Sequence, residues 1–213
     1  YSPYINRDYP TNVYWGDTHL HTNLSVDSYI YGNVQLEPSE AYRFARGEVV
    51  SAHNGMPTRL QRPLDFLVIA DHAENMGVFQ GLEITDADLM ATEKGKRWHK
   101  ILGQIKENSL RNEFDWIGEL HMKMLNEVWA EEVRSQDFIS SMWSNAAAVA
   151  DSYNDPGHFS TLIGYEWSGP SSTHRVVVFK DGADKVTKLK PFSRFDSDDP
   201  EDLWAHLSYY EKQ

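Results

Sequence analysis

Four short apolar runs constrain the fold of this chain more than any other feature of its sequence. They lie at residues 13–15, 64–70, 161–165 and 176–179. The second run reads LDFLVIA, and an almost uninterrupted apolar run of this kind is typical of a strand buried on both faces of a parallel sheet. No run approaches the roughly 18 apolar residues that a membrane span requires. The sequence therefore predicts a fold built on a buried sheet, without a membrane span.

Between these runs the apolar residues recur with the spacing of helices. Trp98, for example, is followed by apolar residues three, four and seven positions later, which places all four on one helical face. The stretches with helical signals are 38–47, 98–105, 117–128, 139–150 and 203–210. This alternation predicts an α/β fold with right-handed crossovers. In it, residues 79–153 form either a helical insertion or a lid over a site.

Composition removes several classes of function. The chain has no cysteine, which excludes disulfides, zinc–thiolate sites and cysteine nucleophiles. It carries 20 Lys and Arg against 32 Asp and Glu, a net charge of −12, and this acidity argues against a nucleic-acid-binding surface. Most of the charge is expected to serve solubility. Nine histidines accompany the carboxylates, so a few of the acidic residues are candidates for cation ligands.

Histidines follow the first two apolar runs. His19 and His21 are two residues apart, and in an extended strand such residues point to the same face, so both can reach one ion. Asp71 and His72 end the run at 64–70. The carboxyl ends of buried strands are where α/β folds hold their functional sites. A shared site at this edge of the sheet is therefore expected.

The third and fourth runs add a carboxylate and another histidine. Glu166 ends an otherwise apolar strand, where a lone carboxylate would be costly unless it were paired or bound to a cation. His174 opens the run that follows. Imidazole and carboxylate ligands without thiolate suit Zn, Mn or Fe, and this many ligands indicate more than one divalent ion.

Three segments carry a resemblance to a known family. They are WGDTHLHTNLSVDS at 15–28, RPLDFLVIADHAE at 62–74, and PGHFSTLIGYEWSG at 156–169 with STHRVVVF after it. In these segments the chain resembles the PHP (polymerase and histidinol phosphatase) superfamily of metal-dependent phosphoesterases. More narrowly, it is similar to a branch labelled only as a domain of unknown function. The resemblance implies a distorted, TIM-like (β/α)7 barrel with two or three metal ions at the carboxyl ends of its strands.

The resemblance also implies roles for individual residues. The metal ligands that it predicts are His19, His21, Asp27, His72, Glu166 and His174. Glu166 is expected to bridge two ions, and Asp71, next to a ligand, is expected to orient an imidazole. The residues predicted to take part in catalysis are Glu166, Asp71 and His53, the last in a turn-rich stretch that is expected to fold near the barrel mouth.

The chain departs from the family pattern after His174. That pattern closes with a further histidine and an Asp-x-His pair on late strands, and the sequence after His174 supplies neither. We therefore expect residues 1–213 to be the amino-terminal part of a single barrel domain. On this interpretation the barrel is incomplete in this chain, and the remainder of the same polypeptide completes it.

These residues and the resemblance predict a metal-dependent hydrolase. The favoured activity is a phosphoesterase that attacks a small phosphorylated substrate with a metal-bound hydroxide. Two alternatives stay open: an amidohydrolase-like hydrolase of a small molecule, and a non-catalytic metal-binding domain. Relatives on the branch often carry a secretion signal, and Tyr1 fits a processed start. A periplasmic or secreted location is therefore expected, with the cytoplasm as the alternative.

Overall fold

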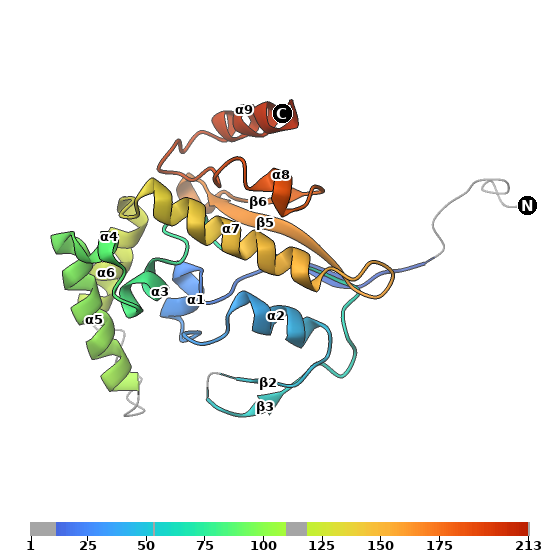
Figure 1. The fold of residues 1–213 in the computed structure, drawn as a ribbon. Helices are drawn as coiled ribbons and strands as arrows, with labels where there is room; N and C mark the ends of the chain where they lie inside the picture. Colours follow the sequence, from blue (N-terminus) through green and yellow to red (C-terminus); the bar gives the residue numbers. More distant parts are fainter. Residues whose placement is uncertain (1–11, 53, 110–118, 213) are drawn as a thin grey trace, which may run out of the picture.

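A curled four-stranded sheet lies at the centre of the structure, a computed structural model that describes residues 12–52, 54–109 and 119–212 (Figure 1). The strand order is β1 (Gly16–Leu20), β4 (Phe66–Ile69), β5 (Ser160–Ser168) and β6 (His174–Phe179). β1, β4 and β5 are parallel, whereas β6 is antiparallel to β5. A small separate hairpin pairs β2 (Val50–Ser51) with β3 (Pro57–Thr58).

The expected (β/α)7 barrel is wrong. In the described residues the main sheet has four strands and curls into about half a barrel. The connection between β5 and β6, residues 169–173, is only five residues long. A parallel crossover needs about a dozen residues or more, so this connection forces β6 to run antiparallel and breaks the β/α alternation. The α/β class holds in its coarse form, as a mixed sheet packed with helices.

The first strand begins later than its apolar run. Residues 13–15 form no strand, and the side chains of Val13, Tyr14 and Trp15 are exposed. The ladder of β1 begins at Gly16, opposite Phe66 at the start of β4. The histidines of the first motif therefore lie in β1 and directly after it. The other three runs each contain or overlap a strand, as expected.

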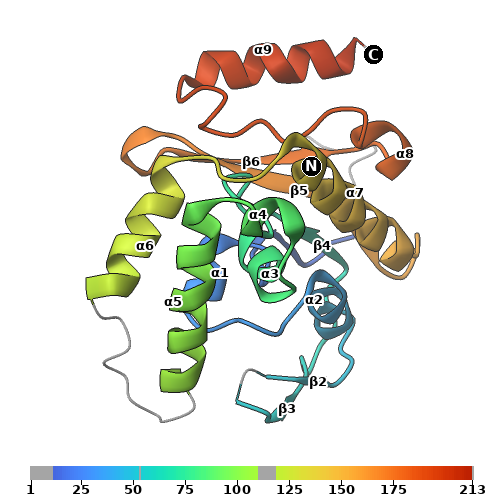
Figure 2. The ribbon, with the colours of Figure 1, turned by 60° about the vertical axis from the view of Figure 1, so that its left-hand side comes forward.

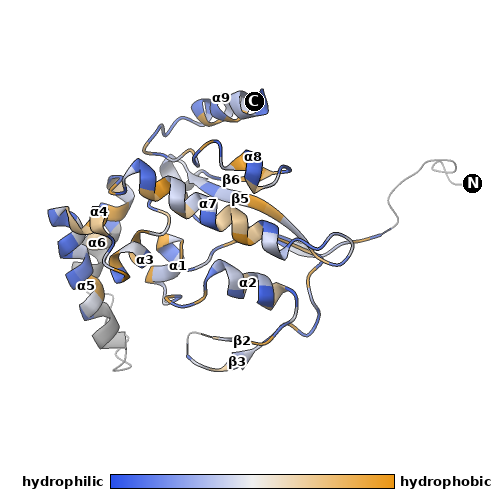
Figure 3. Ribbon diagram, viewed as in Figure 1, coloured by the Kyte–Doolittle hydropathy of each residue, from blue (hydrophilic) through white to orange (hydrophobic). Residues whose placement is uncertain are grey.

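Two helices cover one face of the sheet. α2 (Pro38–Ala45) begins with proline in its first turn and is followed by Gly47, whose φ of 78° ends the helical conformation. α7 (Gln136–Tyr153) packs along β5, and the Ser135 side chain caps its first turn by accepting from the backbone N–H of Phe138. Figure 3 shows apolar residues along β5 and mixed polar and apolar residues along α7. Tyr42 of α2 and Trp143 of α7 belong to the same buried core as the residues of β4 and β5, so both helices pack their apolar residues on the sheet.

A second core holds most of the remaining helices together. The helices around it are α1 (Val26–Ile30), α3 (Val78–Glu83), α4 (Ala87–Met90), α5 (Glu93–Ser109) and α6 (Glu119–Ala130). Trp98, Leu82, Phe79 and Val128 are buried in this core. Figures 1 and 2 show α4, α5 and α6 grouped beyond one end of the sheet. The described part of 79–153 is thus a set of helices with a core of its own, together with α7 on the sheet.

The last two helices follow β6. α8 (Ala183–Val186) contacts α7, and α9 (Pro200–Glu211) begins at Asp199, whose side chain accepts from the backbone N–H of Glu201. Leu203 and Tyr210 are the buried side chains of α9. Within 12–52, 54–109 and 119–212, none of the helices combines the length and the apolar character needed to cross a membrane.

Truncating a side chain in the central strand β4 is expected to lower the stability of the protein strongly. Leu67 is fully buried in the main core, so Leu67→Ala is expected to lower the free energy of unfolding by about 2–5 kcal/mol through lost transfer energy and the cavity left behind. Leu162→Ala on β5 is the matched control, because Leu162 is exposed and its truncation should cost about 0.5 kcal/mol or less. Urea unfolding of both variants measures the difference. Equal losses would show that β4 is not part of the core.

Candidate metal centre

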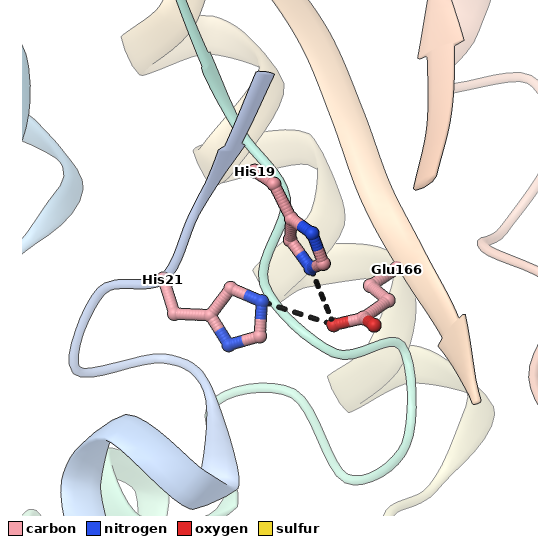
Figure 4. A group of neighbouring side chains, drawn as sticks. All are labelled: His19, His21 and Glu166. Carbon is pink, nitrogen blue, oxygen red and sulfur yellow. Dashed lines mark ion pairs between the residues drawn. The ribbon is translucent and has the colours of Figure 1, made fainter. Parts of the chain in front are cut away.

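Glu166 lies at the middle of a cluster of imidazoles. Its Oε2 atom is 3.0 Å from Nε2 of His19 and 2.9 Å from Nε2 of His21 (Figure 4). Its other oxygen, Oε1, is 2.7 Å from Nδ1 of His174. The Glu166 side chain is only 2% exposed, whereas that of His19 is 48% exposed. The cluster is therefore buried at its carboxylate and open to solvent on the side of His19.

Strand alternation turns Glu166 away from the main core. Tyr165 and Trp167, its neighbours in β5, are both buried in that core. Because successive side chains of a strand point to opposite faces, Glu166 points to the other face. His174 stands opposite Ser168 in the β5–β6 ladder, which puts His174 on the same face as Glu166. The apolar residues on either side of Glu166 thus fix its direction.

An irregularity in β1 helps to aim His19. Asp17 pairs with Leu67 and Leu20 pairs with Ile69, so β1 has one residue more than β4 between the same two rungs. An extra residue of this kind is a bulge, which reverses the facing of the side chains beyond it. Leu20 consequently packs against the main core, while the preceding His19 faces Glu166. His21 follows directly after the strand.

His72 and Asp27 extend the cluster on the side of α1. The backbone continues the β4–β5 pairing past Ile69: the Glu166 N–H donates to the Asp71 carbonyl at 3.0 Å, and the Ala73 N–H donates to the Glu166 carbonyl at 2.8 Å. This pairing holds His72 beside Glu166. Nε2 of His72 lies 3.5 Å from Oδ2 of Asp27, and Nδ1 of His21 lies 3.0 Å from Oδ1 of Asp27.

All six predicted ligands therefore come together. They form three overlapping groups, each able to offer three ligand atoms within 4.8 Å of one another. The groups are His19, His21 and Glu166; His21, Asp27 and His72; and His72, Glu166 and His174. The overlaps allow more than one ion but not three independent ones, because each group shares members with the others.

The charges of the cluster are strongly coupled. Burial alone raises the pKa of Glu166, but the contact with His21, the charge of His72 and the contact with His19 outweigh it and lower that pKa to about 2. Burial alone lowers the pKa of His21, yet Asp27 and Glu166 raise it to about 10. Burial likewise opposes ionisation of Asp27, while His21 and His72 hold its pKa well below its usual range. Without a metal ion, the proton on His21 compensates part of the negative charge of Asp27 and Glu166.

Two buried atoms of the cluster lack hydrogen bonds. Nε2 of His21 and Oε2 of Glu166 face each other at 2.9 Å, but neither makes a hydrogen bond of acceptable direction. Buried polar atoms rarely lack such a partner in folded proteins. A divalent cation that accepts lone pairs from both atoms would satisfy them, and imidazole and carboxylate are ligands that Zn, Mn and Fe accept. The donor set therefore fits a metal ion.

The comparisons with known proteins identify a family. A family model described as a protein of unknown function, DUF3604, matches residues 8–213. The chain belongs to the DUF3604 family. No curated protein and no solved structure matches it. The family description assigns no activity, so the relationship of this DUF3604 chain to the PHP superfamily stays a prediction.

Asp71, a further predicted site residue, lies outside the three ligand groups. Asp71 is buried, and its carboxylate accepts from the backbone N–H of Thr22 at 2.5 Å and from the Thr22 hydroxyl at 2.7 Å. Burial raises the pKa of Asp71 to about 6, against the effect of these hydrogen bonds. In this DUF3604 chain Asp71 thus fixes the turn after His21 rather than contacting an imidazole directly. His53 lies outside the described residues.

Sequence reasoning missed a buried group behind His72. Nδ1 of His72 is 2.7 Å from the Ser168 hydroxyl, and that hydroxyl is 2.6 Å from Oε2 of Glu74. Glu74 is fully buried and Ser168 nearly so. The only signal in the DUF3604 sequence is the position of Glu74 two residues after His72, which a surface carboxylate could share.

A second missed feature fixes the loop that carries His72. Arg134 donates to the carbonyls of Ala73 and Met76, both at 2.8 Å. Asn75, whose φ is 53°, donates to the Val128 carbonyl at 2.7 Å and accepts from the backbone N–H of Val133 at 3.2 Å. The helical region of this DUF3604 chain is thus bonded directly to the loop of the candidate metal centre.

Proposed function

We propose that the chain is a hydrolase of phosphate esters that depends on divalent metal ions. The observation that carries this proposal is the position of Glu166, whose Oε2 atom faces the Nε2 atoms of both His19 and His21 in a buried setting. A buried carboxylate must be paired or bound to a cation, and the two converging imidazole nitrogens are ligand atoms that a divalent ion accepts. The resemblance to the PHP superfamily supports the same chemistry.

The residues of the first group would hold the ion. His19, His21 and Glu166 supply two nitrogens and one oxygen, a set that leaves further coordination positions for solvent or substrate. When bound, a divalent ion supplies Lewis acidity and lowers the pKa of a water molecule toward neutrality. Glu166 and His174, whose side chains are in contact, would hold a second ion.

The charge of the site favours an anionic substrate only when metal is present. The carboxylates of Asp27 and Glu166 would repel a phosphate group, whereas two divalent ions would reverse the local charge. His19 and His174 lie on the exposed side, where a small substrate can approach. The rings of Trp129, on α6, and His72 make a T-shaped contact, with their centroids 4.7 Å apart.

The test is turnover by the chain after metal removal and reloading. Protein stripped with chelator should hydrolyse no phosphate ester, and reloading with Zn²⁺, Mn²⁺ or Fe²⁺ should restore hydrolysis of phosphomonoesters or diesters in a substrate panel. His19→Ala should abolish this activity. His158→Ala is the control, since His158 is 83% exposed and lies outside the cluster, and it should leave the activity unchanged. Stoichiometric metal binding without turnover of any phosphate ester would overturn the hydrolase proposal and favour a non-catalytic metal-binding domain.

A further inference from the structure

Three buried side chains form a line behind the candidate metal centre. Oε2 of Glu74 lies 2.6 Å from the hydroxyl oxygen of Ser168, which lies 2.7 Å from Nδ1 of His72. All three residues are at most 3% exposed, so no solvent competes for these contacts. The positions of their protons decide which nitrogen of His72 is free to bind a metal ion.

Glu74 is arranged to accept hydrogen bonds with both of its oxygens. Oε1 accepts from the backbone N–H of Arg194 at 2.8 Å and from that of Ser168 at 3.2 Å. Oε2 accepts from the Ser168 hydroxyl, and 2.6 Å is the length expected for an O–H donor and a carboxylate acceptor. The single proton of the Ser168 hydroxyl is therefore directed to Glu74.

The lone pairs of Ser168 are consequently left for His72. Three oxygen atoms surround Nδ1 of His72: Ser168 Oγ at 2.7 Å, Glu166 Oε2 at 3.3 Å and Glu74 Oε2 at 3.8 Å. An Nδ1 without a proton would set its own lone pair against these oxygens. An Nδ1–H would donate to Ser168 and face the carboxylates favourably. The contacts thus select the tautomer of neutral His72 that carries its proton on Nδ1.

This tautomer makes Nε2 the metal-binding atom of His72. Nε2 lies on the far side of the ring, 3.5 Å from Oδ2 of Asp27. His72 can then serve an ion together with Asp27 through Nε2, but it cannot contribute Nδ1 to an ion beside Glu166 and His174. Two of the overlapping groups contain His72, and only the group with His21 and Asp27 can use it as a ligand through Nε2.

We propose that Glu74 is a positioning residue that acts through Ser168 to hold the His72 proton on Nδ1, so that His72 binds metal through Nε2. This inference rests on the metal centre of the proposed function but not on phosphate ester hydrolysis. Partners of this kind typically contribute 10–100-fold to metal affinity by fixing the tautomer and the ring orientation.

The direct test is ¹⁵N NMR of the histidines in the metal-free protein, at a pH where His72 is neutral. The His72 signals, assigned with a His72→Gln variant, should show a protonated Nδ1 and an unprotonated Nε2. Addition of Zn²⁺ should shift Nε2 and leave the Nδ1 proton in place. A protonated Nε2 in the metal-free protein, or loss of the Nδ1 proton on Zn²⁺ binding, would overturn the proposal.

The variant test uses Glu74→Gln. The glutamine amide can donate to Ser168, which frees the hydroxyl proton to point at Nδ1 and should move the His72 proton to Nε2. Zn²⁺ affinity, measured by titration calorimetry, should fall 10–100-fold. Glu93→Gln makes the same substitution at a surface site and should change neither readout.

Failure of the metal centre and failure of the positioning role of Glu74 give different results. If the wild-type spectrum has the expected tautomer but no Zn²⁺ binds, the metal centre fails. If Zn²⁺ binds equally well to the wild type and to a folded Glu74→Gln variant, the positioning role fails.

Discussion

Replacing Glu166 with glutamine is expected to lower metal affinity by more than about 100-fold and to remove hydrolysis. Glu166 contributes to two of the three ligand groups, and its Oε2 faces two imidazoles at once. Glutamine has nearly the same shape but lacks the negative charge, and its amide nitrogen cannot bind a cation. Since losing a partner that merely orients a ligand already costs 10–100-fold, losing this carboxylate should cost more.

Elemental analysis and titration calorimetry on Glu166→Gln measure the effect. Circular dichroism should show that the secondary structure of the variant is unchanged, because the substitution adds no volume to the site. His158→Ala again serves as the histidine control outside the cluster. Metal content equal to that of the wild type would remove Glu166 from the centre and would also remove the basis of the proposed hydrolase.

The residues of the cluster were predictable as candidates because their signals are local. His72 follows a strand of almost uninterrupted apolar residues, and Glu166 interrupts another. Both patterns depend on the two-residue repeat of a strand and on the cost of burying charge, which short segments already display. The convergence of these segments follows from parallel strands sharing one carboxyl edge.

Neither the resemblance nor the sequence pattern predicted the observed sheet. The apolar runs at 161–165 and 176–179 are separated by ten residues, whereas β5 and β6 extend beyond these runs and leave only 169–173 to connect them, which limits the two strands to antiparallel pairing. The bulge in β1 could not be foreseen, because it depends on the register with β4 about 50 positions away. Without that bulge, Leu20 rather than His19 would face Glu166.

The positioning contacts were beyond sequence reasoning for a similar reason. Glu74 bonds to Ser168 and to Arg194, which lie 94 and 120 positions away. Arg134 reaches the loop of His72 across about 60 positions. Glu74, Ser168 and Arg134 are residue types that usually lie at the surface, and only the tertiary fold buries them.

The second large effect is a loss of stability of the metal-free protein as the pH rises. Against the effect of burial, the contacts with Asp27 and Glu166 raise the pKa of His21 from 6.5, the value of an unperturbed imidazole, to about 10 in the folded protein. A pKa raised by folding contributes stability below the unfolded value, and the contribution is lost as the pH rises through the folded value. The free energy of unfolding should therefore decline between about pH 6.5 and pH 10, by up to about 4–5 kcal/mol.

Glu166 determines how stability falls on the acidic side of the pH profile. Its pKa falls from 4.5 to about 2 on folding, so its contribution is present above about pH 4.5 and is lost as the pH falls toward 2. The two shifts arise largely from the same contacts, so their energies are not additive. The metal-free protein should be most stable between about pH 4.5 and 6.5.

Thermal unfolding in the presence of chelator, followed from pH 2 to pH 10, measures this profile. Zn²⁺ should change its alkaline side, because a metal ion competes with the proton of His21, and its binding should strengthen as that proton leaves. The metal-bound protein should accordingly gain stability over the metal-free protein as the pH rises above 6.5. His21→Gln has no proton to lose in this range and should flatten the alkaline decline. If the stability of His21→Gln declined equally at alkaline pH, the pH dependence would belong to other groups. The charge coupling between His21, Asp27 and Glu166 would then be contradicted.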